Sequence, residues 1–275
     1  MIIKTQSASY GFFDPQIAAD GRQFQHEYIS AKPYPHIVLD NFLDEDTLEL
    51  CLRDFPDFSA RKTKYAGRQE NLKFEFSPES LSPPLRSLFH SFNSSGFVEF
   101  LENLTGINGL IPDPYFLGGG LHEVAHGGHL NIHADFNDHP VLKKKRCLNA
   151  LIYFNKEWKP EYRGALELWD RGMRQCVRSI HPDFNRCVIF ATGTTSFHGH
   201  PEPLACPDEV ARQSLALYYY TDWLDSDEAP RLVTTDYRLR PNDYARKLRA
   251  GARRVLGQRL SERIGSLLPR GTDGD

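Results

Sequence analysis

The sequence has few of the features that mark secreted, membrane-spanning or disulfide-rich proteins. No C-x-x-C pair occurs among its cysteines, which are scattered at Cys51, Cys147, Cys176, Cys187 and Cys206. This spacing predicts reduced thiols rather than a disulfide framework or a zinc clip. No stretch approaches the roughly 20 apolar residues that span a bilayer, and residues 1–15 lack a cationic start followed by an apolar run. We therefore expect a soluble, cytoplasmic protein with no signal peptide, no membrane-spanning segment and no membrane partner.

An excess of charge of one sign is also missing. The chain has 33 Lys and Arg residues against 36 Asp and Glu residues, a formal net charge of -3. Without a basic field over the molecule, the composition gives no indication of a nucleic-acid or anionic-membrane partner. Apolar residues make up 40% of the 275 positions and charged residues 25%, the balance of an ordinary globular protein. We expect a single domain over residues 1–275.

The first part of the chain predicts one strand and several helices. Residues 35–40 have the pattern of a short strand, and a helix capped by Asp44 or Asp46 is expected after it. Residues 57–80 are polar and are expected to form a solvated loop, with a mobile segment over a site as the alternative. Apolar residues at helical spacing over 83–104 predict one or two core helices.

From about residue 115 short apolar runs alternate with Gly, Pro and Asn. The runs are 115–117, 130–133, 148–154, 165–169, 188–191 and 215–220. This spacing predicts the strands of an antiparallel sandwich or barrel. The segment from Tyr237 to Leu268 has helical spacing and an excess of Arg and Lys, which predicts a basic amphipathic helix. That helix is expected to pack on the domain as a solvated element, and contact with RNA or a partner is the alternative.

These patterns divide the expected domain into three regions. A strand and helices occupy about residues 35–104, a strand-rich core occupies about residues 115–222, and a helical extension occupies about residues 236–268. Candidate chemistry lies in the strand-rich core.

A His-x-Asp motif is the most informative feature of that core. On a strand, residues i and i+2 project from one face, so His133 and Asp135 can converge on one ion. His198, on a distant strand, would complete a 2-His-1-carboxylate set, which is typical of non-haem Fe(II) oxygenases. His200 competes for this third position because it shares a strand face with His198. The His-Gly-x-Pro order favours His198, and His200 is then an outer donor or a buried histidine.

Two further residues predict an acidic co-substrate beside the ion. A 2-oxo acid that chelates iron leaves its far carboxylate in need of a rigid, permanently charged partner, and Arg212 supplies the bidentate fork. The hydroxyl of Tyr153 can donate to the same carboxylate. Asp135 also stands where a halogenase would have Ala or Gly, so hydroxylation is favoured over halogenation.

In this combination the chain resembles the Fe(II)/2-oxoglutarate dioxygenases, specifically their prolyl-hydroxylase-like branch. The resemblance covers about residues 117–222, with a weaker match at 35–56. The segments that carry it are 133–135, 146–158, 164–169, 197–201 and 212–220. It implies a mainly β fold with flanking helices (α+β) and a double-stranded β-helix, or jelly-roll, core.

The resemblance also implies ligands and cofactors. His133, Asp135 and His198 would bind Fe(II), and Arg212 and Tyr153 would hold the C5 carboxylate of 2-oxoglutarate. O2 is the second co-substrate, and ascorbate is a further candidate cofactor. Many relatives carry a tyrosine on the strand before the His-x-Asp pair, but residues 121–125 contain none, so the substrate-side contacts are not carried over.

The implied reaction is hydroxylation of an unactivated C–H bond, with release of succinate and CO2. A small-molecule substrate (an amino acid, a sugar derivative or a biosynthetic intermediate) is favoured because no peptide-binding module is evident beside the core. Hydroxylation of a prolyl or other side chain of a protein is the alternative. A non-enzymatic metal-binding role is the third hypothesis.

Three other interpretations fit the sequence less well. His122-Glu123-Val124-Ala125-His126 spells the H-E-x-x-H of zinc metalloproteases, but that chemistry needs a helix and the flanking glycines disfavour one. A nucleic-acid dealkylase of the same superfamily has a second arginine six positions after the co-substrate arginine, where this chain has Tyr218. A plain β-sandwich would leave the order of the five candidate residues unexplained.

Overall fold

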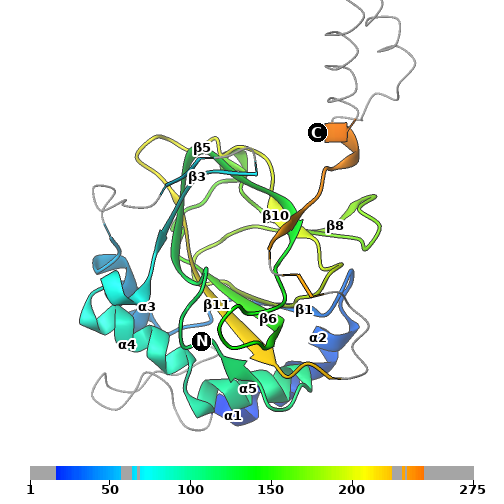
Figure 1. Cartoon of the computed structure of the whole chain (residues 1–275). Helices are drawn as coiled ribbons and strands as arrows, with labels where there is room; N and C mark the ends of the chain where they lie inside the picture. The colour runs from blue at the N-terminus through cyan, green and yellow to red at the C-terminus, as the bar shows by residue number, and fades with distance from the viewer. Residues whose placement is uncertain (1–16, 57–63, 67–68, 225–230, 233, 245–275) are drawn as a thin grey trace, which may run out of the picture.

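The computed structural model describes residues 17–56, 64–66, 69–224, 231–232 and 234–244 (Figure 1). Its α-helices are α1 (Ile17–Asp20), α2 (Gln25–Ser30), α3 (Glu45–Arg53), α4 (Pro83–Phe92) and α5 (Ser95–Thr105). Its strands are β1 (His36–Leu39), β2 (Lys64–Ala66), β3 (Glu70–Phe76), β4 (Ile111–Pro112), β5 (Gly120–Ala134), β6 (Lys145–Tyr153), β7 (Leu166–Trp169), β8 (Cys176–Ile180), β9 (Cys187–Ala191), β10 (His198–His200), β11 (Arg212–Thr221) and β12 (Asp236–Tyr237). No helix among these residues has the length and apolar character that crossing a bilayer requires.

The described strands form one sheet, in which the main order is β1-β9-β6-β11-β5-β10-β7-β8. Neighbouring strands pair antiparallel, and helices pack on the outside of the curled sheet (Figure 1). The curl brings β7 and β10 to face β6 and β9, because Phe190 of β9 lies 4.7 Å from the ring of His198 and shares a buried cluster with Leu166 of β7. Three further strands, β3, β12 and β4, attach to β5 and β11 beside this path, and β2 pairs with β3. The predicted fold class, a mainly β fold with flanking helices and a jelly-roll core, is confirmed.

Strict alternation along the strands separates an inner face from an outer face. Strand β11 illustrates this, because its side chains point in turn into a cavity and into the main hydrophobic core. The cavity-facing residues are Arg212, Ser214 and Tyr218. The core-facing residues are Leu215, Leu217 and Tyr219. The outer face therefore stabilises the fold against the helices, and the inner face is left available for chemistry.

Helices α4 and α5 cover the outer face of the sheet. Ser82 caps α4 by accepting a hydrogen bond from the N–H of Leu85 at 3.4 Å, and Gly106, at φ 76°, ends α5 in the left-handed region. Fully buried phenylalanines fill the interface, and the rings of Phe92 and Phe97 meet edge to face at 4.9 Å. Burial of each such side chain contributes about 1.5–3 kcal/mol to the stability of the fold. The packing of these helices therefore stabilises the outer face of the sheet.

Several elements expected from the sequence are present. Residues 35–40 contain β1, and α3 follows it with Asp44 as the cap, which accepts a hydrogen bond from the N–H of Thr47 at 3.0 Å. The apolar periodicity over 83–104 corresponds to α4 and α5. The amphipathic patterns therefore predicted these helices and β1 correctly.

The expectation of a loop over residues 57–80 was wrong for Lys64–Ala66 and Glu70–Phe76, which form the paired strands β2 and β3. Strand β3 also pairs with β5. Phe74 and Phe76 face the core, whereas Lys73 and Glu75 face the polar cavity. Because both cavity-facing side chains are charged, the segment has the composition of a solvated loop. Residues 57–63 and 67–68 lie outside the described part of the chain.

Two other expected elements differ from the structure. Residues 115–117 form a turn and not a strand, because the Asp113 carboxylate accepts hydrogen bonds from the N–H groups of Tyr115 (2.8 Å) and Leu117 (2.9 Å). Tyr237, the expected start of the basic helix, lies in β12. Residues 241–244 of that expected helix are helical, and the part beyond residue 244 is outside the described residues.

Candidate metal centre

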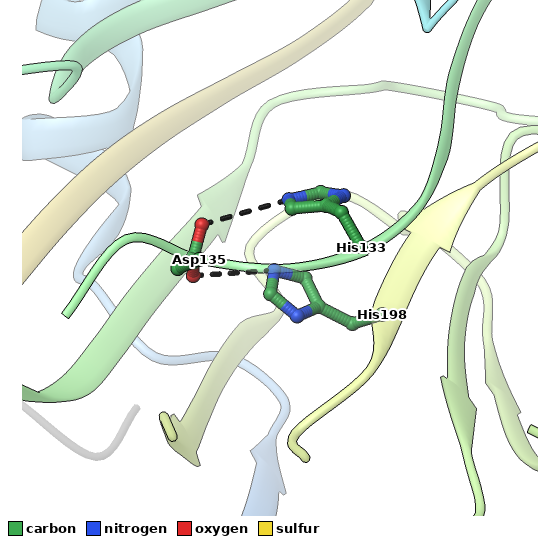
Figure 2. A group of neighbouring side chains, drawn as sticks. All are labelled: His133, Asp135 and His198. Carbon is green, nitrogen blue, oxygen red and sulfur yellow. Dashed lines mark ion pairs between the residues drawn. The ribbon is translucent and has the colours of Figure 1, made fainter. Parts of the chain in front are cut away.

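The two strands that carry the His-x-Asp motif and His198 are direct neighbours. His198 opens β10 and pairs with His133 near the end of β5, and Asp135 follows that strand directly. Nε2 of His133 lies 3.5 Å from Oδ1 of Asp135, and Nε2 of His198 lies 3.5 Å from Oδ2 (Figure 2). One ligand atom from each residue lies within 4.8 Å of the others, so the three can hold one ion. His200 is not part of this group.

Both imidazoles are oriented by the backbone. Nδ1 of His133 donates to the carbonyl of Asn131 at 2.8 Å, and Nδ1 of His198 donates to the carbonyl of Ser196 at 3.0 Å. Because a carbonyl can only accept, Nδ1 carries the proton and Nε2 keeps its lone pair for a metal. Burial, more than any neighbouring charge, lowers the pKa of His198 to about 4. The donor set therefore fits Fe(II), with open positions left for other ligands.

The carboxylate of Asp135 is held by two buried residues that the sequence did not single out. Nδ2 of Asn149 donates to Oδ2 at 2.9 Å, and the Arg146 guanidinium lies 3.1 Å from the same oxygen. Arg146 is itself held, because it donates to Asn149 Oδ1 and stacks 3.4 Å above the centroid of the Tyr218 ring. Burial opposes ionisation of Asp135, but Arg146 with His198 and His133 more than offsets it, and the pKa of Asp135 lies well below its usual range.

A β-bulge explains why the sequence pattern did not predict that Arg146 lines the cavity. Asn149 is four residues before Tyr153, so it shares the inner face of β6 and could have been found by alternation. Arg146 is seven residues before Tyr153, and strict alternation would point it outward. The pairing of β6 with β11 slips by one residue beside Cys147, and this irregularity turns Arg146 inward.

Arg212 and Tyr153, the predicted co-substrate residues, lie together: Arg212 lines the cavity, and Tyr153 is fully buried beside it. Arg212 opens β11 and is 5% exposed. Its Nε donates to the carbonyl of Gly164 at 2.7 Å, and its Nη2 donates to the Tyr153 hydroxyl at 3.3 Å. Burial raises the pKa of Tyr153 although Arg212 opposes this, so the hydroxyl remains protonated and can donate.

The charge of Arg212 has no protein counter-ion in the described structure. Among the described residues, no carboxylate lies within 4.0 Å of its guanidinium. A buried charge without a partner carries a desolvation penalty of several kcal/mol. Such a group is suited to bind an anionic ligand in a bidentate manner.

One cavity of about 200 Å³ connects the three-residue group with Arg212. Its apolar lining includes Val124, Leu151 and Leu166, and its polar lining includes His122 and Ser214. The volume and the mixed lining suit a small organic ligand that reaches from the ion to the guanidinium.

A further wall of this cavity comes from β3 and β12. Lys73 on β3 forms ion pairs with Glu75 at 2.7 Å and Glu70 at 3.5 Å, and all three line the cavity. Burial opposes the charge of Lys73, but the carboxylates more than offset it and raise its pKa. From β12 the ring of Tyr237 lies 5.4 Å from the ring of His133. No sequence pattern pointed to these residues, because β3 resembles a loop and the position of β12 is a tertiary effect.

The His122–His126 motif lies on β5 and not on a helix, as the sequence analysis expected. His122 donates from Nε2 to the Gly118 carbonyl at 3.1 Å, while His126 hydrogen-bonds the carbonyl of Cys206. Among the described residues neither histidine belongs to a group that could hold an ion. The geometry therefore gives the metalloprotease interpretation no support.

Gly199, between the two histidines of β10, permits the close approach of that strand to β5. A Cβ at this position would lie 2.8 Å from the carbonyl oxygens of Leu130 and Asn131, and the Asn131 carbonyl is the one that orients His133. We expect Gly199→Ala to weaken metal binding by about 10- to 100-fold, as measured by anaerobic calorimetric titration of metal-free protein. Gly193→Ala is the control, because the nearest atom to its Cβ is Ser196 Oγ at 3.8 Å. Equal metal affinity of both variants would contradict this account.

Comparison with known proteins agrees with this site. A sequence profile described as the 2OG-Fe(II) oxygenase superfamily matches residues 119–220. This portion of the chain includes the three candidate ligands, Arg212 and Tyr153. The predicted resemblance to Fe(II)/2-oxoglutarate dioxygenases is thereby confirmed, and the description of the family names the two predicted cofactors, Fe(II) and 2-oxoglutarate.

Solved structures with a similar fold include a prolyl hydroxylase from Trichoplax adhaerens in complex with a peptide of hypoxia inducible factor. It is 15% identical, with a TM-score of 0.50 over 74% of this chain and 91% of that one. A Pseudomonas putida prolyl-4-hydroxylase is 14% identical, with a TM-score of 0.48 over 74% of this chain and 100% of that one. HygX from Streptomyces hygroscopicus, with nickel, 2-oxoglutarate and hygromycin B bound, is 11% identical, with a TM-score of 0.49 over 79% and 97%. Comparison with curated protein sequences found no match.

Proposed function

We propose that this protein is an Fe(II)- and 2-oxoglutarate-dependent dioxygenase that hydroxylates an unactivated C–H bond of a small molecule. The observation that carries the proposal is the buried guanidinium of Arg212, which lacks a carboxylate partner among the described residues and shares a cavity with His133, Asp135 and His198. A cation site and an anion site in one cavity are what a metal-chelating 2-oxo diacid requires.

The candidate metal ligands, Arg146 and Arg212 have separate tasks in this reaction. When bound, Fe(II) and 2-oxoglutarate supply the activation of O2 that oxidises a substrate C–H bond, with succinate and CO2 as co-products. His133, Asp135 and His198 would hold the ion, while Arg146 keeps Asp135 ionised and oriented. Arg212 would clamp the distal carboxylate of the co-substrate. Preorganised charges of this kind need little rearrangement during the reaction.

An apolar cluster lies next to the candidate metal ligands. The Phe190 ring packs 4.7 Å from the ring of His198, and Leu166 and Val188 belong to the same buried cluster. An apolar floor of this kind excludes water, and it strengthens the electrostatic interactions of Arg212 with a bound carboxylate.

A small-molecule substrate is supported by the small volume of the cavity, about 200 Å³, and by its polar walls. Strand β3 borders it with Glu70, Lys73 and Glu75, and the C-terminal segment borders it with Thr235 and Tyr237. Charged and phenolic groups at the wall would contact a polar substrate of limited size. A prolyl or other protein side chain remains the second candidate, because the fold is that of a peptide-binding prolyl hydroxylase.

The experiment for the proposed function is a succinate-release assay with iron-loaded protein. Amino acids, sugar derivatives and other polar metabolites form one panel, and proline-containing peptides and lysate proteins form the other. Mass spectrometry should show addition of one oxygen to a member of the first panel. Hydroxylation only in the second panel would replace the small-molecule assignment, and absence of 2-oxoglutarate turnover with and without substrates would refute the dioxygenase assignment.

Removal of the Arg212 clamp is expected to raise the 2-oxoglutarate requirement. A charge-assisted hydrogen-bonded contact contributes about 1.5–3 kcal/mol, so the KM of Arg212→Ala for 2-oxoglutarate should rise by about 10- to 150-fold. Arg212→Lys should fall between this variant and wild type, because lysine keeps the charge and loses the fork. Initial rates against 2-oxoglutarate concentration test this. An unchanged KM in Arg212→Ala would show that the carboxylate binds elsewhere.

A further inference from the structure

His200 is a buried histidine of the cavity to which the reaction outlined above gives no role. It ends β10, pairs with Leu130 of β5 and is only 4% exposed. It lines the cavity that also contains His198 and Arg212.

The imidazole of His200 has no hydrogen bond to any described residue. Its Nδ1 is fully buried and has no partner. His133 and His198 differ in this respect, because the Nδ1 of each bonds a backbone carbonyl. Leaving a buried polar group unsatisfied costs about 1–3 kcal/mol, and native structures satisfy nearly all such groups. An unsatisfied ring inside a binding cavity is therefore suited to contact a ligand.

The surroundings of His200 favour an anionic ligand. Arg212 is the charged neighbour that acts most strongly on its ring, and Lys73 is the next. A metal ion is disfavoured by these cations, and the ring lies outside the group of ligand atoms around Asp135. An imidazole has at least one N–H donor in either protonation state, so it can serve a carboxylate.

The existing donors leave room for a further contact to that carboxylate. Nε of Arg212 is occupied by the Gly164 carbonyl, and Nη2 is shared with the Tyr153 hydroxyl. A carboxylate offers two oxygens with about four acceptor positions. The free N–H groups of Arg212 and the hydroxyl of Tyr153 therefore leave at least one acceptor position of the carboxylate open to another donor.

We propose that His200 is a positioning residue that donates a hydrogen bond to the distal carboxylate of 2-oxoglutarate, beside Arg212 and Tyr153. The inference rests on the proposed function and adds a third donor to its co-substrate site. The contact would make the site selective for a 2-oxo acid with a second carboxylate.

Ligand binding without turnover tests this proposal. Wild type, His200→Leu and His200→Gln are loaded with Mn(II), and calorimetry measures binding of 2-oxoglutarate and of 2-oxopentanoate, which has the same chain length without the distal carboxylate. We expect His200→Leu to bind 2-oxoglutarate about 5- to 50-fold more weakly and to bind 2-oxopentanoate as wild type does. His200→Gln, which keeps an N–H donor, should recover most of the affinity, and Mn(II) affinity should not change.

Several outcomes would overturn the assignment. Equal weakening for both ligands would mean that His200 acts near the metal or through the fold, and unchanged 2-oxoglutarate affinity would mean that it makes no contact. Loss of Mn(II) from His200→Gln would make His200 a metal ligand. Failure of wild type itself to bind 2-oxoglutarate, with Mn(II) bound, would refute the proposed function and this contact with it. If wild type binds 2-oxoglutarate normally, the proposed co-substrate site stands, and the affinities of the His200 variants then test the contact of His200 alone.

Discussion

The Asp135→Ala variant is expected to bind no Fe(II), to release no succinate and to be less stable than wild type even without metal. The first two effects follow because one of three ligands is lost and two imidazoles remain. The third follows from Arg146, which is 2% exposed and loses the only carboxylate that the described structure pairs with it. Breaking a buried ion pair from one side costs about 3–5 kcal/mol.

The matched variant His133→Ala separates these effects. It also removes a ligand, so metal and activity should be lost, but the ion pair between Asp135 and Arg146 remains. Elemental analysis after anaerobic reconstitution measures the metal, and denaturant unfolding in the presence of a chelator measures the free energy of unfolding. Equal stability of the two metal-free variants would contradict the role given to Arg146. Retention of iron by either variant would refute the ligand assignment.

The apolar outer face made much of the fold predictable. Core-facing residues of β6 and β11, such as Leu148 and Leu217, alternate with inner residues, and α4 and α5 show a regular apolar stripe. Burial against the helices imposes these periods on the sequence. Strand β3 shows alternation over only its last four residues, because its register shifts at Leu72, whose φ is 52°. So short a pattern with charged inner residues has the composition of a loop.

The candidate site was predictable where it depended on residue type and order. His133, Asp135 and His198 lie together, and Arg212 lies beside Tyr153, as the sequence analysis expected. Spacing along the chain could not reveal contacts that depend on an irregular register or on tertiary packing. The bulge that turns Arg146 inward and the pairing of β12 with β5 are of this kind.

The ion pair of Asp135 and Arg146 links the stability of the protein to metal binding. In the metal-free protein the guanidinium is the main charge that keeps the buried carboxylate ionised. A bound divalent cation would share that task. Metal and Arg146 should therefore be partly interchangeable in their effect on stability, although only the metal supports the reaction.

Arg146→Met is accordingly expected to destabilise the metal-free protein by about 3–5 kcal/mol, and to gain more stability from added metal than wild type does. Methionine fills the space over Tyr218 without supplying a charge, so Asp135 is left as an unpaired buried carboxylate until a cation arrives. Because a ligand that binds only the folded state raises stability with the logarithm of its concentration divided by its Kd, the melting temperature with and without a fixed concentration of Mn(II) measures this gain for each protein.

The double variant Asp135→Ala/Arg146→Met is the control that identifies the cause. Removing both charges leaves no buried ion without a partner, so the metal-free double variant should be more stable than either single variant, and Mn(II) should have no effect on it. Additive losses in the double variant would mean that packing around Tyr218 and Asn149, and not the charge pair, explains the single-variant effects. A response of Arg146→Met to Mn(II) no larger than that of wild type would show that the ion and the guanidinium do not act on the same carboxylate.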